Sequence, residues 1–389
     1  MIKGGIIIGG GIGGLTTAIA LTRRGIPVTL YEQAPALLGI GSGLNIASNA
    51  LVLLAELGLA DAIAEAGHDV ADAVITDHRE RVLTSIPVSY IKQRTGHGII
   101  SIHRGKLLEV LLSQVEDGII CTSKRFQSYV QDEEGVTVYF EDGSSERGGF
   151  LICADGVHSR GRQQLHPEVR PRYSGQVCWR FIVPGASSFI RPADLCEMWG
   201  QEKGLRAAYV PVNREELYCY ITHYEPAGGK DDPATVKDYL SGICQSFPDA
   251  FHRLIAAVHP AHIIRSDCYD LAPIGQWYDG RAVLLGDAAH ATTPNLGQGA
   301  CQAVEDAYVL AQCLEEEKSP QAAFVRFQQL RKDRTTYICN TSWSINQIVN
   351  KGGWQKSLAK GLLSLLPGFM QRKQIGQVYF HDIGGGRKL

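Results

Sequence analysis

The first part of the chain combines short apolar runs with a helical pattern. Ile6–Ile8 is an uninterrupted β-branched run, as expected for a strand that is buried on both faces. After a stretch of glycines, alanine and leucine recur at helical spacing over Leu15–Arg23, and Gly25 ends the pattern. Val28–Tyr31 is a second apolar run, and Glu32 follows it. Strand, helix and strand in this order predict a βαβ unit.

The rest of the chain divides into helical and strand-rich regions. Asn49–Leu57, with Ser48 as its cap, and Arg104–Val115 carry apolar residues at helical spacing. The middle of the chain has period-two runs instead, which predicts a separate, largely antiparallel sheet. Two long helices are predicted at Gln298–Glu316 and Gln321–Val349. The predicted strands are Phe126–Gln131 and Val136–Glu141, which form a hairpin, and then Phe150–Cys153, Val177–Val183, Leu205–Val210, Leu217–Thr222 and Ala282–Leu285.

Length and composition narrow the class of protein. With 389 residues the chain is too long for one hydrophobic core, so we expect two packed lobes. The net charge is −2 and no basic stripe with interleaved aromatics occurs, which argues against nucleic-acid binding. The ten cysteines form no CxxC pair and no cluster with zinc spacing, so we expect reduced thiols and no metal site. No apolar run is long enough for a membrane span.

The glycines between the first strand and the first helix follow the pattern GxGxxG. Gly9, Gly11 and Gly14 occupy its three glycine positions, and Gly13 adds another. Glycine permits a tight turn and lets the backbone approach a pyrophosphate, while the helix N-terminus offers free N–H groups. Glu32 is placed to bind adenosine ribose hydroxyls and to repel a 2′-phosphate. The loop therefore predicts a site for FAD or NAD rather than NADP.

Two further motifs distinguish FAD from NAD. Asp155-Gly156 follows the strand Phe150–Cys153, and Gly286-Asp287 follows the strand Ala282–Leu285. GxGxxG, DG and GD motifs in this order resemble the group A flavoprotein monooxygenases, the family of para-hydroxybenzoate hydroxylase, over residues 4 to 335. The resemblance implies bound FAD, with Asp287 on a ribityl hydroxyl and Asp155 serving both FAD and the pyridine nucleotide. A simple Asp-Gly turn is the alternative for Asp155.

The same resemblance implies further cofactor-binding residues. The segment that enters the helix Gln298–Glu316 is expected to present backbone N–H groups to the isoalloxazine ring. Gly43 lies in a segment expected beside the flavin, and Arg104 is expected to face the FAD pyrophosphate, with a surface arginine as the alternative. His290 is expected to support the loop rather than to act in catalysis. The residues of the helix-entering segment are Pro294, Leu296, Gly297, Gln298 and Gly299.

The strand-rich middle is expected to cover the flavin ring and to carry the substrate residues. Within the family, the chain is most similar to the branch of urate, salicylate and hydroxynicotinate hydroxylases. Gly204–Val212 resembles the segment that carries a catalytic arginine in urate hydroxylase, which places Arg206 in that role. Tyr218 falls at a substrate-facing tyrosine of that enzyme. The alternatives are an ordinary arginine on the surface of a strand for Arg206 and a core tyrosine with a satisfied hydroxyl for Tyr218.

Two positions depart from the urate hydroxylase pattern. Asn295 stands where the resemblance predicts an aspartate, and Arg180 where it predicts an asparagine. We assign both to the substrate site; the alternatives for Arg180 are that it contacts FAD instead or contacts neither. Because Arg180 adds positive charge, it favours an anionic aromatic substrate and makes urate itself doubtful.

The predicted fold class is α/β. It combines a Rossmann-like FAD-binding domain, an interleaved and mainly antiparallel substrate domain, and C-terminal helices. The FAD-binding domain is assigned to residues 1–75, 98–175 and 265–335, and the substrate domain to residues 76–97 and 176–264. Residues 336–389 are assigned to a C-terminal helical segment, in which Leu358–Phe369 is an amphipathic helix packed on the body.

The sequence thus predicts a single-component FAD monooxygenase. The resemblance implies that NADH or NADPH visits transiently and reduces the flavin, that O₂ then forms a C4a-hydroperoxide, and that one oxygen is transferred to a small, anionic aromatic or heteroaromatic substrate. One alternative is an FAD-dependent epoxidase or oxidoreductase on a polyketide, antibiotic or polyprenyl substrate. Another is a flavin-binding sensor without catalysis. We expect a cytoplasmic monomer or homodimer, because the N-terminal apolar run is too short for a secretion signal.

Overall fold

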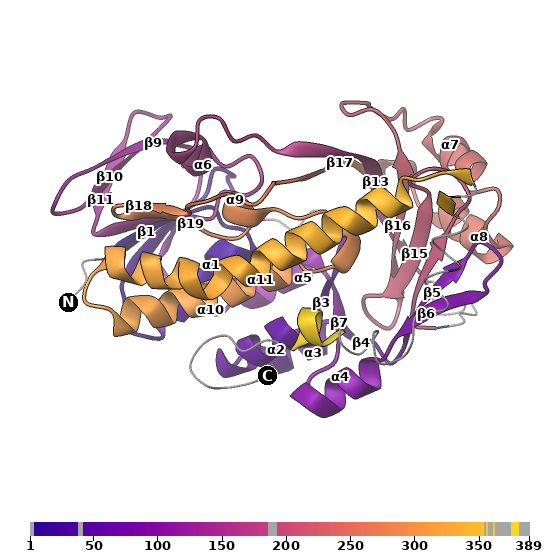
Figure 1. Ribbon diagram of the computed structural model, residues 1–389, viewed down its shortest axis with the longest axis horizontal. Coiled ribbons are helices and arrows are strands. Elements are labelled where there is room, and N and C mark those ends of the chain that lie inside the picture. The colour runs from indigo at the N-terminus through magenta and orange to yellow at the C-terminus, as the bar shows by residue number, and fades with distance from the viewer. Residues whose placement is uncertain are drawn as a thin grey trace.

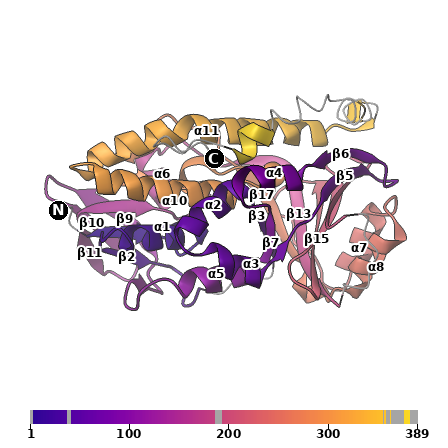
Figure 2. The ribbon, with the colours of Figure 1, turned by 90° about the horizontal axis from the view of Figure 1, so that it is seen from below.

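The computed structural model of the protein has a large sheet at each end and long helices that run between them (Figure 1). It describes residues 4–37, 42–185, 193–353, 355–356, 361 and 375–380. The helix α11, Pro320–Val349, runs lengthwise over both halves of the molecule, and Figure 2 shows it lying beside α10, Gly299–Glu316. No helix among the described residues is long and apolar enough to cross a membrane.

The sheet at the N-terminal end has the predicted Rossmann-like arrangement. Among the described residues its strand order is β18-β19-β12-β1-β2-β8, and all neighbours pair in parallel except β18 with β19. Every residue of β1 and β12 is buried, which is why their sequences are apolar throughout and do not alternate. The strands are β18 (Tyr278–Asp279), β19 (Ala282–Leu284), β12 (Phe150–Cys153), β1 (Gly5–Ile8), β2 (Val28–Tyr31) and β8 (Ile120–Cys121).

The second large sheet is the predicted antiparallel one. Its order in the described residues is β17-β13-β16-β15-β14-β5-β6, and only β14 with β5 pairs in parallel. The predicted domain boundaries at residues 76, 176 and 264 cut through this sheet, because three of its strands extend past them. The strands are β17 (Ile264–Asp270), β13 (Arg172–Pro184), β16 (Glu216–Tyr224), β15 (Arg206–Pro211), β14 (Leu195–Trp199), β5 (Ala73–Asp77) and β6 (Val82–Ile86).

The two faces of the antiparallel sheet differ, because side chains alternate along each strand. One face is apolar: Trp179, Ala207 and Cys219 join a buried cluster that the helices α7, Val236–Ile243, and α8, Asp249–Ala257, cover. The strand register places polar neighbours on the opposite face. We call this the polar face, and its residues are Gln176, Cys178 and Arg180 of β13, Tyr218, Tyr220 and Thr222 of β16, Arg206 of β15 and Glu197 of β14.

Smaller sheets and helices complete the fold. The predicted hairpin forms β9 and β10 of one small sheet, and a second small sheet holds β3 against β7. These strands are β9 (Phe126–Gln131), β10 (Val136–Phe140), β11 (Ser145–Gly148), β3 (Gly43–Ile46), β7 (Ile100–His103) and β4 (His68–Asp69). The remaining helices are α1 (Ile12–Thr22), α2 (Ser48–Glu56), α3 (Ala60–Ala66), α4 (Val88–Thr95), α5 (Arg104–Leu112), α6 (Arg160–Leu165), α9 (Asp287–His290) and the 3₁₀ turns η2 (Pro260–His262) and η3 (Pro294–Leu296).

One detail of the sequence prediction was wrong. Ser48 does not cap α2: the cap position is Ala47, and the Ser48 hydroxyl instead donates to the carbonyl of Tyr379 at 3.4 Å. The boundary at residue 336 falls inside α11, which continues without a break to Val349. The predicted helix Leu358–Phe369 lies outside the described residues except for Gly361.

Candidate active site

The glycine loop brings the backbone of β1 close to its neighbours. Gly9 has φ +105°, and a Cβ built on it would lie 2.4 Å from the carbonyl oxygen of Ala154. A Cβ on Gly14 would lie 1.9 Å from the carbonyl oxygen of Gly9, and one on Gly13 would lie 3.0 Å from a methyl group of Leu285. Larger side chains are therefore excluded at Gly9 and Gly14 by the fold itself.

Gly11 differs from the other glycines because the space in front of it is open. It is the N-cap residue of α1, and a Cβ built on it would have no atom within 4 Å. No side chain caps the helix, and its first turn holds no acidic residue. The free N–H groups and the positive end of the helix dipole thus face a space that an anionic group such as a pyrophosphate can fill.

Glu32 lies at the edge of a cavity of about 430 Å³ beside this helix end. Its two carboxylate oxygens accept hydrogen bonds from the backbone N–H groups of Gly10, at 2.7 Å, and Ala34, at 2.8 Å. These bonds fix the carboxylate in place but leave it further lone pairs for ligand hydroxyls. The cavity is also lined by Gly9, Gly11, Tyr31, Lys124, Arg125, Phe126, Asp155, Gly156, His158 and Arg160.

Asp155 of the DG motif binds the first turn of the helix α6, whose N-cap is Ser159. One of its oxygens accepts from the backbone N–H groups of Arg160, at 2.8 Å, and Gly161, at 3.2 Å. The other oxygen is buried and has no hydrogen-bond partner among the described residues. Burial raises the pKa of Asp155, and these hydrogen bonds only partly offset that effect. The residue therefore has a structural role at the rim of the cavity as well as any role towards a cofactor.

Asp287 of the GD motif is the first residue of the short helix α9. Its side chain is exposed, yet protein atoms surround it closely enough that burial raises its pKa. The positive charges of His290, Arg104 and Arg162 oppose that rise. Arg104 itself is exposed and begins α5, whose cap is the His103 side chain. The Asp287 carboxylate and the Arg104 guanidinium are thus brought towards the same region from different motifs.

A buried charge cluster holds the GD loop in place. Asp306 of α10 accepts from the backbone N–H of Gly286 at 3.0 Å, from the Arg331 side chain at 2.7 Å, and lies 2.5 Å from His290 Nε2. Burial opposes ionisation of Asp306, but His290 and Arg331 hold its pKa below the usual value. His290 is therefore a partner of Asp306 beneath the loop, as the sequence predicted. Removing one member of such a buried cluster would leave an uncompensated charge.

The segment Pro294–Gly299 forms the entrance to α10. Pro294 and Gly297 are exposed, and Gly297 has φ +62° with open space around it. Gln298 is buried, and its side-chain oxygen accepts from the Asn49 amide at 2.9 Å. Backbone groups of the exposed part are thus free to meet a ligand, while Gln298 attaches the segment to α2. We call Pro294–Gly299 the flavin loop after its predicted role.

Arg206 connects the polar face to the flavin loop. Its guanidinium donates to the side-chain oxygen of Asn295 at 2.7 Å. It also contacts Thr222 at 3.4 Å, and its side chain is almost completely buried. The alternative of an ordinary surface arginine does not fit this burial. Asn295 in turn donates to the carbonyl of Ser342 in α11 at 2.9 Å, so the arginine is held between the sheet and the loop.

Tyr218 and Arg180 form a second contact between the sheet and the FAD-binding half. A Cβ on Gly43 would lie 2.4 Å from the Tyr218 ring, so only glycine permits this contact. The Tyr218 hydroxyl and the Arg180 guanidinium are hydrogen-bonded, and Arg180 also donates to the hydroxyl of Ser266. Burial raises the pKa of Tyr218, and the charge of Arg180 opposes the rise. Tyr218 is therefore a neutral phenol at neutral pH.

Two cysteines lie beside the arginines of the polar face. Cys178 is hydrogen-bonded to Cys268 of β17, and this bond, together with the charges of Arg180 and Arg206, lowers the pKa of Cys178 to about 6 against the effect of burial. The pKa of Cys268 is raised, first by its bond to Cys178 and then by burial. The cysteines are free and mostly buried, as expected, but the acidic shift of Cys178 was not predicted from the sequence.

The sequence analysis also missed Glu197 and Tyr220. The carboxylate of Glu197 lies 3.5 Å from the Arg206 guanidinium and accepts hydrogen bonds from Trp199, at 2.7 Å, and from the Tyr220 hydroxyl. A signal was present: Tyr220 is two residues from Tyr218 on one strand, so period-two alternation places both on one face. Glu197 carried no such signal, because its position depends on how β14 pairs with β15.

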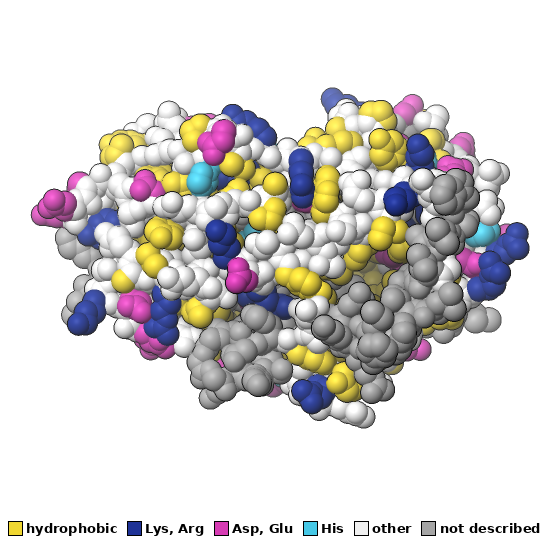
Figure 3. Space-filling view, in the orientation of Figure 1, with side chains coloured by type: hydrophobic (Ala, Val, Ile, Leu, Met, Phe, Trp, Pro, Cys, Tyr) yellow, Lys and Arg dark blue, Asp and Glu magenta, His cyan; other side chains and the backbone are white. Residues whose placement is uncertain are grey.

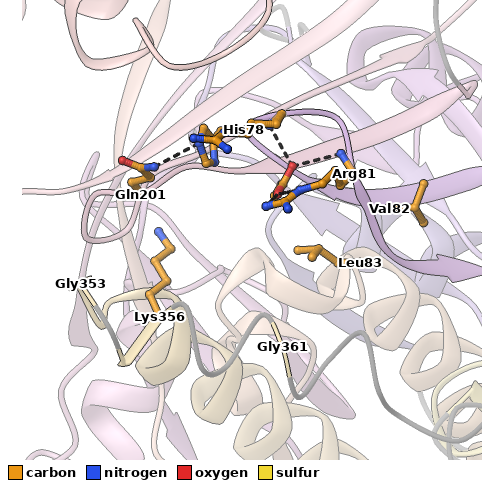
Figure 4. A pocket seen from close by; sticks show the side chains of 10 residues that line it. His78, Arg81, Val82, Leu83, Gln201, Gly353, Lys356 and Gly361 are labelled. Carbon is orange, nitrogen blue, oxygen red and sulfur yellow. Dashed lines mark hydrogen bonds and ion pairs between the residues drawn. The ribbon is translucent and has the colours of Figure 1, made fainter.

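A larger cavity, of about 760 Å³, lies elsewhere in the molecule (Figure 4). It is formed around the hairpin of β5 and β6, where Arg81 is paired with Asp77 and Gln201 contacts His78 at 3.1 Å. It holds none of the predicted site residues, so its size alone does not make it the active site. No cluster of three or more possible metal ligands occurs among the described residues. Figure 3 shows positive and negative side chains interspersed over the visible face.

Comparison with known proteins identifies the family to which the chain belongs. The family model described as "FAD binding domain" matches residues 5–338. The aurachin C monooxygenase/isomerase of Stigmatella aurantiaca is 40% identical, with 91% of each chain covered. The FAD-dependent urate hydroxylase of Klebsiella pneumoniae is 32% identical, with 85% of this chain and 86% of that protein covered. The chain belongs to the group A flavin monooxygenases. The sequence-based assignment to this family is therefore confirmed.

A solved structure of the family matches almost the whole chain. The crystal structure of Klebsiella pneumoniae HpxO with FAD and uric acid has a TM-score of 0.89 and 28% identity, and it covers 97% of this chain and 96% of that one. FAD is thus the cofactor that this flavin monooxygenase binds. The open space before Gly11 and the accessible carboxylate of Asp287 both fit FAD, the first its pyrophosphate and the second a hydroxyl of its ribityl chain.

Proposed function

We propose that this flavin monooxygenase uses NADH or NADPH and hydroxylates a small, anionic heteroaromatic compound at the polar face. In the overall reaction the substrate C–H, O₂, NAD(P)H and a proton give the hydroxylated product, water and NAD(P)⁺. FAD, when bound, supplies the chemistry that activates O₂ and accepts reducing equivalents. The observation that carries the proposal is the bond of Arg206 to Asn295, because it joins the polar face to the flavin loop.

The residues of the polar face have separate roles in this proposal. Arg206 fixes the distance between the sheet and the flavin loop, and its burial removes water from that contact. Arg180 is partly exposed, and among the described residues no carboxylate pairs with it. It is therefore available to an anionic substrate group. The neutral Tyr218 hydroxyl, which is bonded to Arg180, orients the same group.

We also propose which residues bind each part of FAD. The N-terminus of α1 at Gly11 holds the pyrophosphate, with Arg104 adding positive charge, and Glu32 binds the adenosine ribose. Asp287 accepts from the ribityl chain, and the flavin loop donates backbone N–H groups to the ring. The chain has no second GxGxxG loop, so we propose that the pyridine nucleotide binds transiently.

The test is consumption of NADH and of NADPH by FAD-loaded protein with a panel of aromatic acids, hydroxypyridines, purines, quinolones and aurachin C. At least one compound should stimulate the oxidation and give a product one oxygen heavier. In Arg180→Gln, the KM of an anionic substrate should rise much more than that of a neutral analogue. If no compound stimulates NAD(P)H oxidation across the panel, the proposed hydroxylase function is wrong.

A further inference from the structure

Glu197 is an acidic residue at the centre of the polar face that no motif accounts for. Its side chain is 13% exposed, and its carboxylate receives three groups: the Trp199 indole N–H, the Tyr220 hydroxyl and the Arg206 guanidinium. A buried carboxylate with this many partners is fixed in position. It comes from β14, as does Trp199, while Arg206 comes from the neighbouring β15 and Tyr220 from β16, the next strand of the sheet.

Arg206 needs a negatively charged partner because burial of its guanidinium disfavours the charged form. Burial lowers the pKa of a guanidinium, yet the negative charge of Glu197 reverses that effect and raises the pKa of Arg206. Its other hydrogen-bond partners are Asn295, Thr222 and, at 3.5 Å, Gln176, which are all uncharged. Asn295 in particular is an amide and contributes no charge. Among the described residues Glu197 is thus the carboxylate that balances Arg206.

Arg180, the other arginine of the polar face, has different partners. Arg180 is hydrogen-bonded to the Tyr218 and Ser266 hydroxyls and lies beside the Cys178 thiol, and no described carboxylate is within ion-pair distance of it. The two cations of the polar face are therefore unequal. Arg206 is compensated by a carboxylate at every pH near neutrality, whereas Arg180 has hydroxyl neighbours and the Cys178 thiol, which is neutral below its pKa of about 6.

We propose that Glu197 is a positioning and specificity-determining residue, which holds Arg206 against Asn295 and cancels its charge, so that Arg180 alone attracts the anionic group of a ligand. This inference rests on the proposed function, in which the polar face binds the substrate. Without the carboxylate, Arg206 would be an uncompensated buried cation and would also attract anions. The discrimination between an anionic ligand and its neutral analogue would then change.

The experiment compares Glu197→Gln with the unaltered FAD-loaded protein at one fixed pH below 6, where the Cys178 thiol is neutral and leaves Arg180 uncompensated. The ligands are an aromatic carboxylate and its uncharged carboxamide, chosen from the compounds that bind, and binding is followed by the change in flavin absorbance. Glu197→Gln should raise the ratio of carboxylate to carboxamide affinity about tenfold, which corresponds to about 1.4 kcal/mol. If Glu197 has a purely structural role, Glu197→Gln should lower the affinity for both ligands equally and leave the ratio unchanged. That result would overturn the inference.

Two further variants sharpen the test. Glu202→Gln removes the same charge from an exposed glutamate paired with His223, and it should leave the ratio unchanged. Glu197→Gln combined with Asn295→Asp returns a carboxylate to Arg206 from the flavin loop, so the ratio should fall back to that of the unaltered protein. A folded double variant that keeps a raised ratio contradicts the inference.

Failure of this inference can be distinguished from failure of the proposed function. If neither ligand class perturbs the flavin spectrum of the unaltered protein and no compound stimulates NAD(P)H oxidation, the substrate assignment of the polar face is wrong. If ligands bind and the ratio of carboxylate to carboxamide affinity is the same in Glu197→Gln as in the unaltered protein, only the proposed role of Glu197 is wrong.

Discussion

The guanidinium of Arg206 donates to the side-chain oxygen of Asn295 at 2.7 Å, and this bond joins β15 of the antiparallel sheet to the flavin loop. Arg206→Lys keeps the positive charge but loses the planar fork that reaches Asn295, Glu197 and Thr222 together. We expect the fraction of consumed NAD(P)H that yields hydroxylated product to fall about tenfold, with FAD still bound. Quantifying product and peroxide per NAD(P)H tests this, and unchanged coupling would show that the bond does not matter for catalysis.

The second prediction concerns the open space in front of Gly11. Because a Cβ there has no neighbour within 4 Å, Gly11→Ala should leave the thermal stability of the FAD-free protein unchanged. The methyl group would occupy the space assigned to the pyrophosphate, so the Kd of FAD should rise by about tenfold or more. Fluorescence titration with FAD measures this. Gly11→Ala protein with normal FAD affinity would place the pyrophosphate elsewhere.

The third prediction concerns the contact between Gly43 and Tyr218. A methyl group on Gly43 would lie 2.4 Å from a buried ring, so Gly43→Ala should destabilise the protein by about 1–3 kcal/mol. Gly242→Ala is the matched control, because Gly242 lies exposed in α7 with open space around it. That variant should be neutral or slightly more stable. Denaturant unfolding gives the free energy of unfolding of Gly43→Ala and Gly242→Ala. Equal values would mean that Gly43 of β3 is not in tight contact with Tyr218.

The fourth prediction concerns Cys178 and pH. The hydrogen bond to Cys268 and the charges of Arg180 and Arg206 lower the pKa of the Cys178 thiol to about 6, although burial acts to raise it. Above this pH the thiolate offsets the charge of Arg180, and below it the thiol is neutral and Arg180 is left uncompensated. The affinity for an aromatic carboxylate, which stays ionised, should therefore increase as pH falls through about 6.

The groups that face Cys178 determine how this prediction is tested. They are Arg180 on its own strand, Cys268 and Ser266 on β17, Arg206 on β15 and Tyr218 on β16. Of these, the arginines and Tyr218 do not titrate between pH 5 and 8, and the pKa of Cys268 is raised. Cys178→Ser should therefore abolish the step in ligand affinity. If the step persists in that variant, another group causes it.

The FAD-binding half was largely predictable because its signals are local. Gly9, Gly14, Glu32 and Asp287 each stand at a fixed place relative to a buried strand, so spacing along the chain locates them in space. The ends of β2 and β12 also agree with the sequence pattern, because these largely buried strands are bounded by polar or turn residues.

The polar face was less predictable because strand register creates it. Arg206 and Tyr218 came from a resemblance, while Glu197 depends on the pairing of β14 with β15, which no local pattern reveals. Cys178 and Cys268 lie 90 residues apart and meet only because β17 returns to pair with β13. Ser48 was misassigned as a cap because its hydroxyl contacts Tyr379, far along the chain.

The most direct test of the account is the origin of the oxygen in the product. FAD-loaded protein is supplied with NAD(P)H, a substrate from the panel and ¹⁸O₂ in unlabelled water, and the product is analysed by mass spectrometry. A flavin monooxygenase that hydroxylates at the polar face should give a product carrying one ¹⁸O atom, in an amount that falls in Arg206→Lys. A product with oxygen from water, or one that gains hydrogen without oxygen, would contradict the account.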